Sequence, residues 1–253
     1  MAEVETDNRT QMHGLRLGTS MICTSDARKR LEVIIELERA LVNDAKKVLR
    51  VVSSSKILAG LGAILEDNRG TEETYELSQP AEVIPLFISH SWRTDRWTKT
   101  LALSGHLHMS KAFALSVACL LACVLAVQQA SPEGHCMPYH LDGAWMPWTE
   151  TWAPWLHDVL RASVVPALPG LAFATILFWG HALPGFSVDC FLDKSCIHQT
   201  DLALKKQAID SLDIFLRFSE RMLVLYSPEY LSRLWCIYEL ATFIKLHPDG
   251  PSR

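Results

Sequence analysis

A carboxylate, a tryptophan and a cysteine near the end of the chain have the spacing of side chains that share one helix face. Glu239 follows Trp235 by four residues and Cys236 by three, and residues three and four apart are neighbours on a helix. A carboxylate beside a reacting sugar can stabilise the positive charge that develops when a glycosidic bond breaks. A solvated glutamate beside a Trp-Cys pair of the core would explain the same pattern, so both interpretations stay open.

The segments around Glu239 alternate between apolar runs and amphipathic stretches. Residues 187–192 and 221–226 are predicted as buried strands, and residues 201–219 and 228–245 as helices. Residues 83–88 form a third short apolar run, typical of a strand buried on both faces. Alternating strands and helices favour a parallel sheet, whose ligands bind beyond the carboxyl ends of the strands. We expect residues 83–88 to pair with 187–192 or 221–226 in one such sheet.

Three motifs resemble the TIR (Toll/interleukin-1 receptor) domain family. FISHSWRTD resembles its first-strand motif, with Ser89 at the strand end and Asp95 in the next loop, and VDCFLDK resembles its second-strand motif, with Asp193 opening the BB loop. LVLYSPEYLSRLWCIYELATFI is similar to the plant-type pattern Ser-x-x-Trp-Cys-x-x-Glu-Leu; the matching residues are Ser227, Tyr230, Ser232, Trp235, Cys236, Glu239 and Leu240. The resemblance implies a flavodoxin-like α/β fold, of which the chain holds a part.

The resemblance also implies an activity. In TIR enzymes the glutamate of the Trp-Cys-x-x-Glu pattern cleaves NAD at the nicotinamide glycosidic bond, and that role falls on Glu239. NAD is then a substrate and no cofactor is expected; the candidate residues for contacting it are Ser89, Trp92, Asp95, Asp193 and Trp235. Trp92 can stack on a planar ring, or it can lie at a membrane interface. Many TIR domains only assemble with other TIR domains, so a non-catalytic adaptor is the alternative function.

Two apolar runs separate the first motif from the second. Residues 112–127 carry no charge, and residues 162–185 are long enough to span a bilayer. Their connection, residues 128–161, is rich in tryptophan and acidic, whereas basic residues precede the first run: Arg93, Arg96, Lys99 and Lys111. These features predict a hairpin that crosses the membrane twice, with both termini cytoplasmic. Two buried helices of a soluble protein are the alternative.

The chain before the first motif has a different pattern. Apolar residues recur every seven positions within residues 26–52, which predicts an amphipathic helix that packs on the following domain or self-associates as a short coiled coil. Acidic residues and Pro80 then indicate a linker. The predicted organisation is a helical region with its linker (1–80), the first part of the TIR-like domain (81–100), the inserted hairpin (101–185) and the second part (186–253).

Charge and cysteine usage limit the remaining function classes. A formal net charge of −4 argues against nucleic-acid binding. Seven cysteines, two of them inside an apolar run, favour reduced thiols. Cys196 and His198 lack a usual zinc-ligand spacing, so no metal site is predicted. Only fourteen residues follow Glu239, whereas TIR domains have about five strands. Either the chain is a fragment of a longer product or its sheet is truncated, and a three-stranded sheet would have an unpaired edge. The partners expected are the membrane and other TIR domains, including copies of this chain.

Overall fold

The described strands form one five-stranded mixed sheet. A computed structural model describes residues 27–129, 167–248 and 250. The strands run in the order β2-β1-β4-β3-β5; their bounds are β1 Arg50–Ser53, β2 Gln79–Pro80, β3 Leu86–His90, β4 Asp189–Phe191 and β5 Met222–Leu225. β3 lies between β4 and β5 and is parallel to both, with Leu86 opposite Cys190 and Ile88 opposite Leu223. The prediction that residues 83–88 join one parallel sheet with the later runs is confirmed.

Two strands come from a part of the chain predicted as helix and linker. The N-terminal helix ends at residue 48, and β1 follows and pairs antiparallel with β4. β2 then pairs antiparallel with β1. The predictions of a helix to residue 52 and of a linker up to Pro80 are therefore wrong, and β1 and β2 extend the three predicted strands to a sheet of five. Val51 and Val52 are 2% and 0% exposed because they pack in the core as strand residues.

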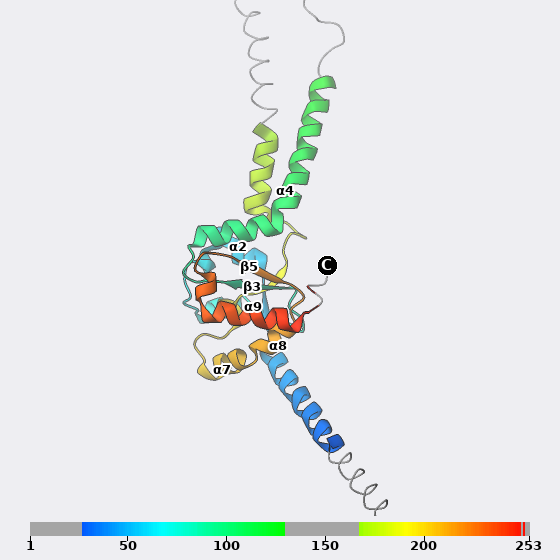
Figure 1. The fold of residues 1–253 in the computed structure, drawn as a ribbon. Coiled ribbons are helices and arrows are strands. Elements are labelled where there is room, and N and C mark those ends of the chain that lie inside the picture. The colour runs from blue at the N-terminus through cyan, green and yellow to red at the C-terminus, as the bar shows by residue number, and fades with distance from the viewer. Residues whose placement is uncertain (1–26, 130–166, 249, 251–253) are drawn as a thin grey trace, which may run out of the picture.

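Helices cover both faces of this sheet (Figure 1). α2 and the first part of α4 lie on one face, and α9 with α8 lies on the other. The helix bounds are α2 Ser54–Gly62, α3 Glu72–Glu76, α4 Arg96–Gln129, α6 Asp193–Cys196, α7 Leu202–Asp210, α8 Leu212–Arg217 and α9 Leu234–Leu246, with 3₁₀ turns at Ala63–Leu65, Gly180–Ala182 and Tyr230–Ser232. Further helices occupy residues 27–48 and 167–179.

Two of the predicted helices differ from those observed. The helix predicted over residues 201–219 is divided at Ser211 into α7 and α8. Asp201 begins α7, and its side chain accepts hydrogen bonds from the amides of the first turn. α9 begins at Leu234 instead of near Pro228, because a 3₁₀ turn at Tyr230–Ser232 comes first. This later start points the first turn of α9 at the carboxyl end of β3, where the candidate site lies.

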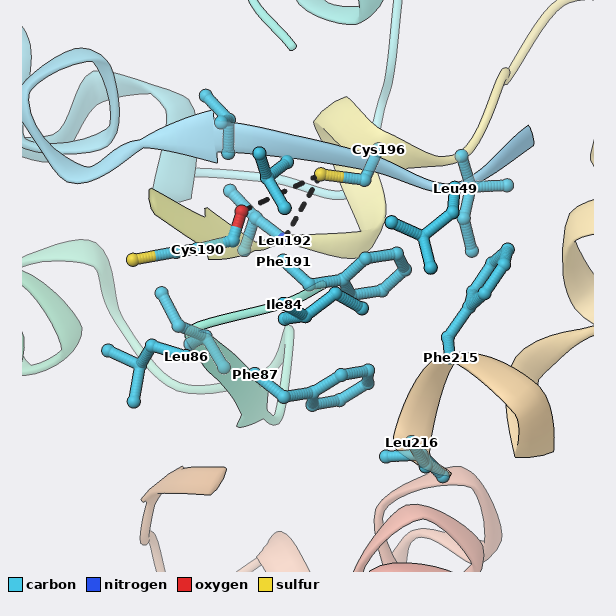
Figure 2. Close-up of a cluster of buried hydrophobic side chains, with 14 of the residues drawn as sticks. Leu49, Ile84, Leu86, Phe87, Cys190, Phe191, Leu192, Cys196, Phe215 and Leu216 are labelled. Carbon is cyan, nitrogen blue, oxygen red and sulfur yellow. Dashed lines mark hydrogen bonds between the residues drawn. The ribbon is translucent and has the colours of Figure 1, made fainter. Parts of the chain in front are cut away.

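Stacked aromatic rings fill the core below the sheet (Figure 2). Phe87 of β3 and Phe191 of β4 stack with ring centroids 4.8 Å apart, and Phe215 of α8 lies 5.6 Å from Phe191. On the other side of Phe191, the Leu192 amide donates a hydrogen bond to Cys196 Sγ at 3.5 Å. The buried side chains of β3, β4 and α8 thus form one continuous core, which fixes the relative positions of the strand ends.

α4 leaves the core part of the way along its length (Figure 1). Leu103 is fully buried on the sheet, whereas Phe113 and Leu121 are 64% and 59% exposed. The second part of α4 contacts the helix at 167–179: Ser116 Oγ donates to the Pro169 carbonyl at 3.0 Å, and His108 Nδ1 lies 3.3 Å from the Leu177 carbonyl. The residue numbers run in opposite directions, so the two helices are antiparallel.

In length and composition, one described helix qualifies as a membrane span: Arg96–Ala126. The apolar helix at Ala167–Ala182 is shorter than a span requires. Residues 162–166 of the second predicted run lie outside the described residues, as does most of the tryptophan-rich connection.

Candidate functional site

Glu239 is a buried residue of α9 that is hydrogen-bonded to β3. Its carboxyl group is covered so that the residue is 4% exposed. The Ser89 hydroxyl donates a hydrogen bond of 2.5 Å to Glu239 Oε2. The Tyr230 hydroxyl lies 2.6 Å from Ser89 Oγ, and either group can be the donor. The interpretation of Glu239 as a solvated helix residue is therefore wrong; it belongs to a buried polar chain that links α9, β3 and the turn before α9.

Burial shifts the titration of this chain of groups. Loss of solvent and the negative charge of Asp193 raise the pKa of Glu239, hydrogen bonds from the Ser89 hydroxyl and the Trp235 indole lower it, and the resulting pKa is about 8. Burial also raises the pKa of Tyr230 to about 12. A carboxyl group with its pKa near 8 changes charge within the physiological range, a property common at functional sites.

A cavity of about 320 Å³ lies next to this buried chain, at the carboxyl ends of β3 and β4. Its wall holds three predicted site residues, Trp92, Asp193 and Trp235. They come from the loop after β3, the start of α6 and the first turn of α9. An open parallel sheet places its ligands at this edge, as expected.

Trp92 and Asp193 are held together within this wall. Trp92 Nε1 donates to Asp193 Oδ2 at 2.9 Å, and the His90 ring lies edge-on to the Trp92 ring at 4.4 Å. The ammonium of Lys99, a residue of α4, lies 4.8 Å from the Trp92 ring centroid. Lys99 is 1% exposed and packs beneath the tryptophan. One face of Trp92 is thus occupied by protein, and its conformation is fixed by Asp193 at the start of α6 and by Lys99 of α4.

The predicted site residues occupy three kinds of position. Trp92, Asp193 and Trp235 line the cavity. Ser89 and Glu239 contact each other behind that wall. Asp95 lies apart: it is exposed, and its carboxylate accepts a 3.0 Å hydrogen bond from the Thr98 amide in the first turn of α4. Hydrogen bonds from Thr98 lower the pKa of Asp95, which here caps a helix.

Several residues of the cavity wall were not singled out from the sequence. These are Asn68, His90, Ser91, Lys194, Gln199, Arg233 and Cys236, the last predicted only as core. His90 and Ser91 directly follow Ser89 at the end of β3, so they could have been predicted as site residues from their position at the strand end. Arg233 lies in the match to the plant-type pattern, at a position where that pattern names no residue. Asn68 comes from the segment predicted as linker, and nothing in the sequence pointed to it.

Lys194 joins the predicted linker to the cavity. Its ammonium donates to the carbonyls of Ile64 and Asp67 at 3.1 and 2.9 Å and to the Asp67 carboxylate at 2.9 Å. The hydrogen bond from Lys194 lowers the pKa of Asp67. Because all three donor positions of an ammonium are used, Lys194 is a structural cation of the wall. Within the described ranges, no group of His, Cys, Asp and Glu side chains has the arrangement of a metal site.

The comparisons with known proteins agree with the motifs. The family model described as TIR domain matches residues 178–250, which include β4, β5 and α9. The comparison with curated proteins and the comparison with solved structures each gave no significant match. The mixed α/β architecture with an open five-stranded sheet is compatible with a TIR fold. β3 lies outside the matched residues, but it pairs with both matched strands, β4 and β5. The segment 178–250 of this chain is therefore TIR-domain sequence, and the predicted family resemblance is confirmed there.

Proposed function

We propose that this chain is a membrane-anchored TIR signalling protein that cleaves NAD to nicotinamide and ADP-ribose when its copies self-associate. A TIR domain indicates a signalling or adaptor role and association with other TIR domains. The observation that supports the enzymatic part is the position of Glu239: its carboxyl group lies behind the cavity wall formed by Trp92, Asp193 and Trp235.

The chemistry needs one carboxylate. When the bond between ribose C1′ and the nicotinamide nitrogen breaks, its electron pair goes to the nitrogen, so nicotinamide leaves as a neutral molecule without protonation. The ribose then carries oxocarbenium charge, and water adds to C1′ and loses a proton to give ADP-ribose. A carboxylate of Glu239 stabilises the charge on the ribose. A protonated Glu239 cannot do so, which makes the reaction depend on pH.

Access to Glu239 requires movement of the wall. The carboxyl group is 4% exposed, and Trp235 and Cys236 of the preceding helical turn lie between it and the cavity. Trp235 is 37% exposed, so part of its side chain faces solvent. A site that opens by rearrangement of α9 is compatible with activity that depends on assembly.

Self-association has a candidate surface in the N-terminal helix. This helix projects from the domain on the side opposite to the second part of α4 (Figure 1). Leu31, Ile34 and Leu41 on it are 57%, 59% and 55% exposed, whereas Ala45 near its C-terminal end and Leu49 just after it are fully buried in the core. Packing on the domain therefore covers only the end of its apolar stripe, and a second copy of the helix would cover the rest.

The membrane anchor is proposed from α4 and the helix at 167–179. α4 bends where it leaves the sheet (Figure 1), and its exposed second part is apolar over more than three turns. In this proposal residues 162–185 supply a second crossing that returns the chain to β4, which keeps both termini on the cytoplasmic side. Alkaline carbonate washing of membranes tests the anchor, since an integral protein stays in the pellet. Release into the supernatant would mean that these helices are not inserted.

The alternative is a non-catalytic adaptor. The hydrogen bond between Ser89 and Glu239 favours it, because a buried carboxyl group that ties α9 to β3 has a structural use without any reaction. The test is nicotinamide release from NAD by the full chain at high density in vesicles. We expect Glu239→Gln to slow release by about a hundredfold or more. Glu229→Gln, at an exposed glutamate in the preceding turn, is the matched control. Equal rates in Glu239→Gln and the native chain, or no release by either, would establish the adaptor.

A further inference from the structure

The first turn of α9 forms one wall of the cavity and has no side-chain cap. α9 has thirteen residues and begins after Arg233, whose side chain makes no capping hydrogen bond. Arg233, Trp235 and Cys236 all line the cavity. The free amides of a helix N-terminus carry partial positive charge and attract anions. A helix end alone does not define a site, so the side chains around it decide whether a ligand fits.

His90 supplies an unpartnered polar group at the same wall. It is the last residue of β3, and it is 6% exposed. Its Nε2 atom is buried and has no hydrogen-bond partner within the described part of the chain. Cys236 Sγ donates a hydrogen bond to the His90 carbonyl at 3.4 Å, which holds the histidine against the first turn of α9. A buried ring nitrogen left without a partner costs about 1–3 kcal/mol, and a ligand in the cavity can remove that cost.

Arg233 supplies a full positive charge that no described group uses. Its side chain lines the cavity and is half-buried, and the described residues offer it no hydrogen bond or ion pair. Lys194, the other cation of the wall, is already bound by Ile64 and Asp67. The arginine is therefore the cation that remains for a ligand.

Asp193 places the negative charge of the cavity on the other side. It follows β4, whereas Arg233 follows β5, and β3 with His90 lies between these two strands. The Asp193 carboxylate is occupied by the Trp92 indole at 2.9 Å and by the Lys194 amide at 2.7 Å. The cavity is thus polarised across β3, with its positive end at Arg233 and α9.

We propose that His90, Arg233 and the first turn of α9 form an anion subsite that binds the pyrophosphate of a dinucleotide. The proposal rests on the proposed function, since it states which end of the cavity holds the phosphates of NAD. The glycosidic bond would then lie toward Trp235 and Glu239, on the same helix. A guanidinium, ring N–H and helix amides are the donors that bind phosphate oxygens well.

The test measures binding of ADP-ribose to the full chain in nanodiscs by calorimetry, without any turnover. We expect Arg233→Gln to weaken binding by about tenfold to a hundredfold, the usual effect of losing a charge-assisted hydrogen bond. Adenosine, which has no phosphate, should bind equally to both proteins. Arg217→Gln is the matched control, because Arg217 pairs with Glu38 on the surface and does not line the cavity.

The outcomes separate this subsite from the catalytic proposal. ADP-ribose binding that is lost in Arg233→Gln supports the subsite even if no nicotinamide is released. A second arm uses inorganic pyrophosphate alone, and competition with ADP-ribose would show that the site recognises the pyrophosphate itself. Equal ADP-ribose affinity in Arg233→Gln and the native chain, or no measurable affinity in either, would overturn the proposal. The Arg233 side chain makes no capping hydrogen bond to α9, and circular dichroism of Arg233→Gln and the native chain checks that both proteins fold alike.

Discussion

The buried carboxyl group of Glu239 should make the stability of the fold depend on pH. Its pKa is raised to about 8 in the folded chain by burial, against 4.5 for an ordinary glutamate. Between these two pH values the folded state keeps a proton that the unfolded state has lost. The contribution of this group to stability is therefore complete below pH 4.5 and is lost as the pH rises toward 8.

The size of the effect follows from the separation of the two pKa values. One pKa unit corresponds to about 1.4 kcal/mol, so a shift from 4.5 to about 8 gives an upper bound on the order of 5 kcal/mol. The Glu239→Gln variant keeps the size of the side chain and cannot titrate. We expect the free energy of unfolding of the native chain to fall relative to that of the variant by several kcal/mol between pH 4.5 and 8.

Urea unfolding of both proteins in nanodiscs, followed by tryptophan fluorescence, measures this difference. Histidines titrate in the same range, but they are common to both proteins and cancel in the comparison. A difference between the two proteins that stays constant from pH 5 to pH 8 would refute the reasoning, because Glu239 would then have an ordinary pKa in the folded chain.

Three further predictions follow from the core and the site. Phe191→Ala should lower the free energy of unfolding by about 3–5 kcal/mol, because Phe191 stacks on Phe87 and contacts Phe215. Thermal unfolding measures this loss, and a value below about 1 kcal/mol would contradict the packing. Gly62→Ala should lower the free energy of unfolding by about 1–3 kcal/mol. The reason is that Gly62 has a φ of 70° and an added Cβ would lie 2.0 Å from Thr100 Oγ1. An unchanged midpoint of thermal unfolding would contradict this geometry. The rate of nicotinamide release by vesicle-bound protein should rise with pH and level off above about pH 8, because the carboxylate form of Glu239 is the active one. A rate that falls between about pH 6 and 8 would contradict a catalytic role of this carboxylate.

The sequence predicted the central strands because their chemistry is local. Residues 83–88, 187–192 and 221–226 are short apolar runs followed by polar loops, and β3, β4 and β5 lie within a few residues of them. β1 could not be separated from the helix before it, since Val48 and Leu49 continue the same apolar stripe into Val51. Its strand conformation comes from pairing with β4, which is a tertiary effect.

The site was predictable only in part, for a related reason. Glu239, Trp235 and Asp193 were found from motif spacing, and motif spacing carries no information on burial. Whether Glu239 faces solvent or Ser89 depends on how α9 packs on β3, and the later start of α9 shifts that packing. The contribution of Asn68 and Lys194 depends on a contact between two segments more than one hundred residues apart, which a single sequence does not reveal.

The insertion between β3 and β4 is compatible with the sheet because α4 has two environments. Parallel neighbours such as β3 and β4 need a crossover connection, usually a helix on one face of the sheet. The first part of α4 fills this role: Lys99 is 1% exposed beneath Trp92, Leu103 is fully buried, and Thr100 Oγ1 lies 3.4 Å from the Leu61 carbonyl of α2. The same helix then continues as the apolar, exposed part that contacts residues 167–179. α4 therefore connects the support of Trp92 at one end to the candidate span at the other, and it bends between these two parts where it leaves the sheet (Figure 1).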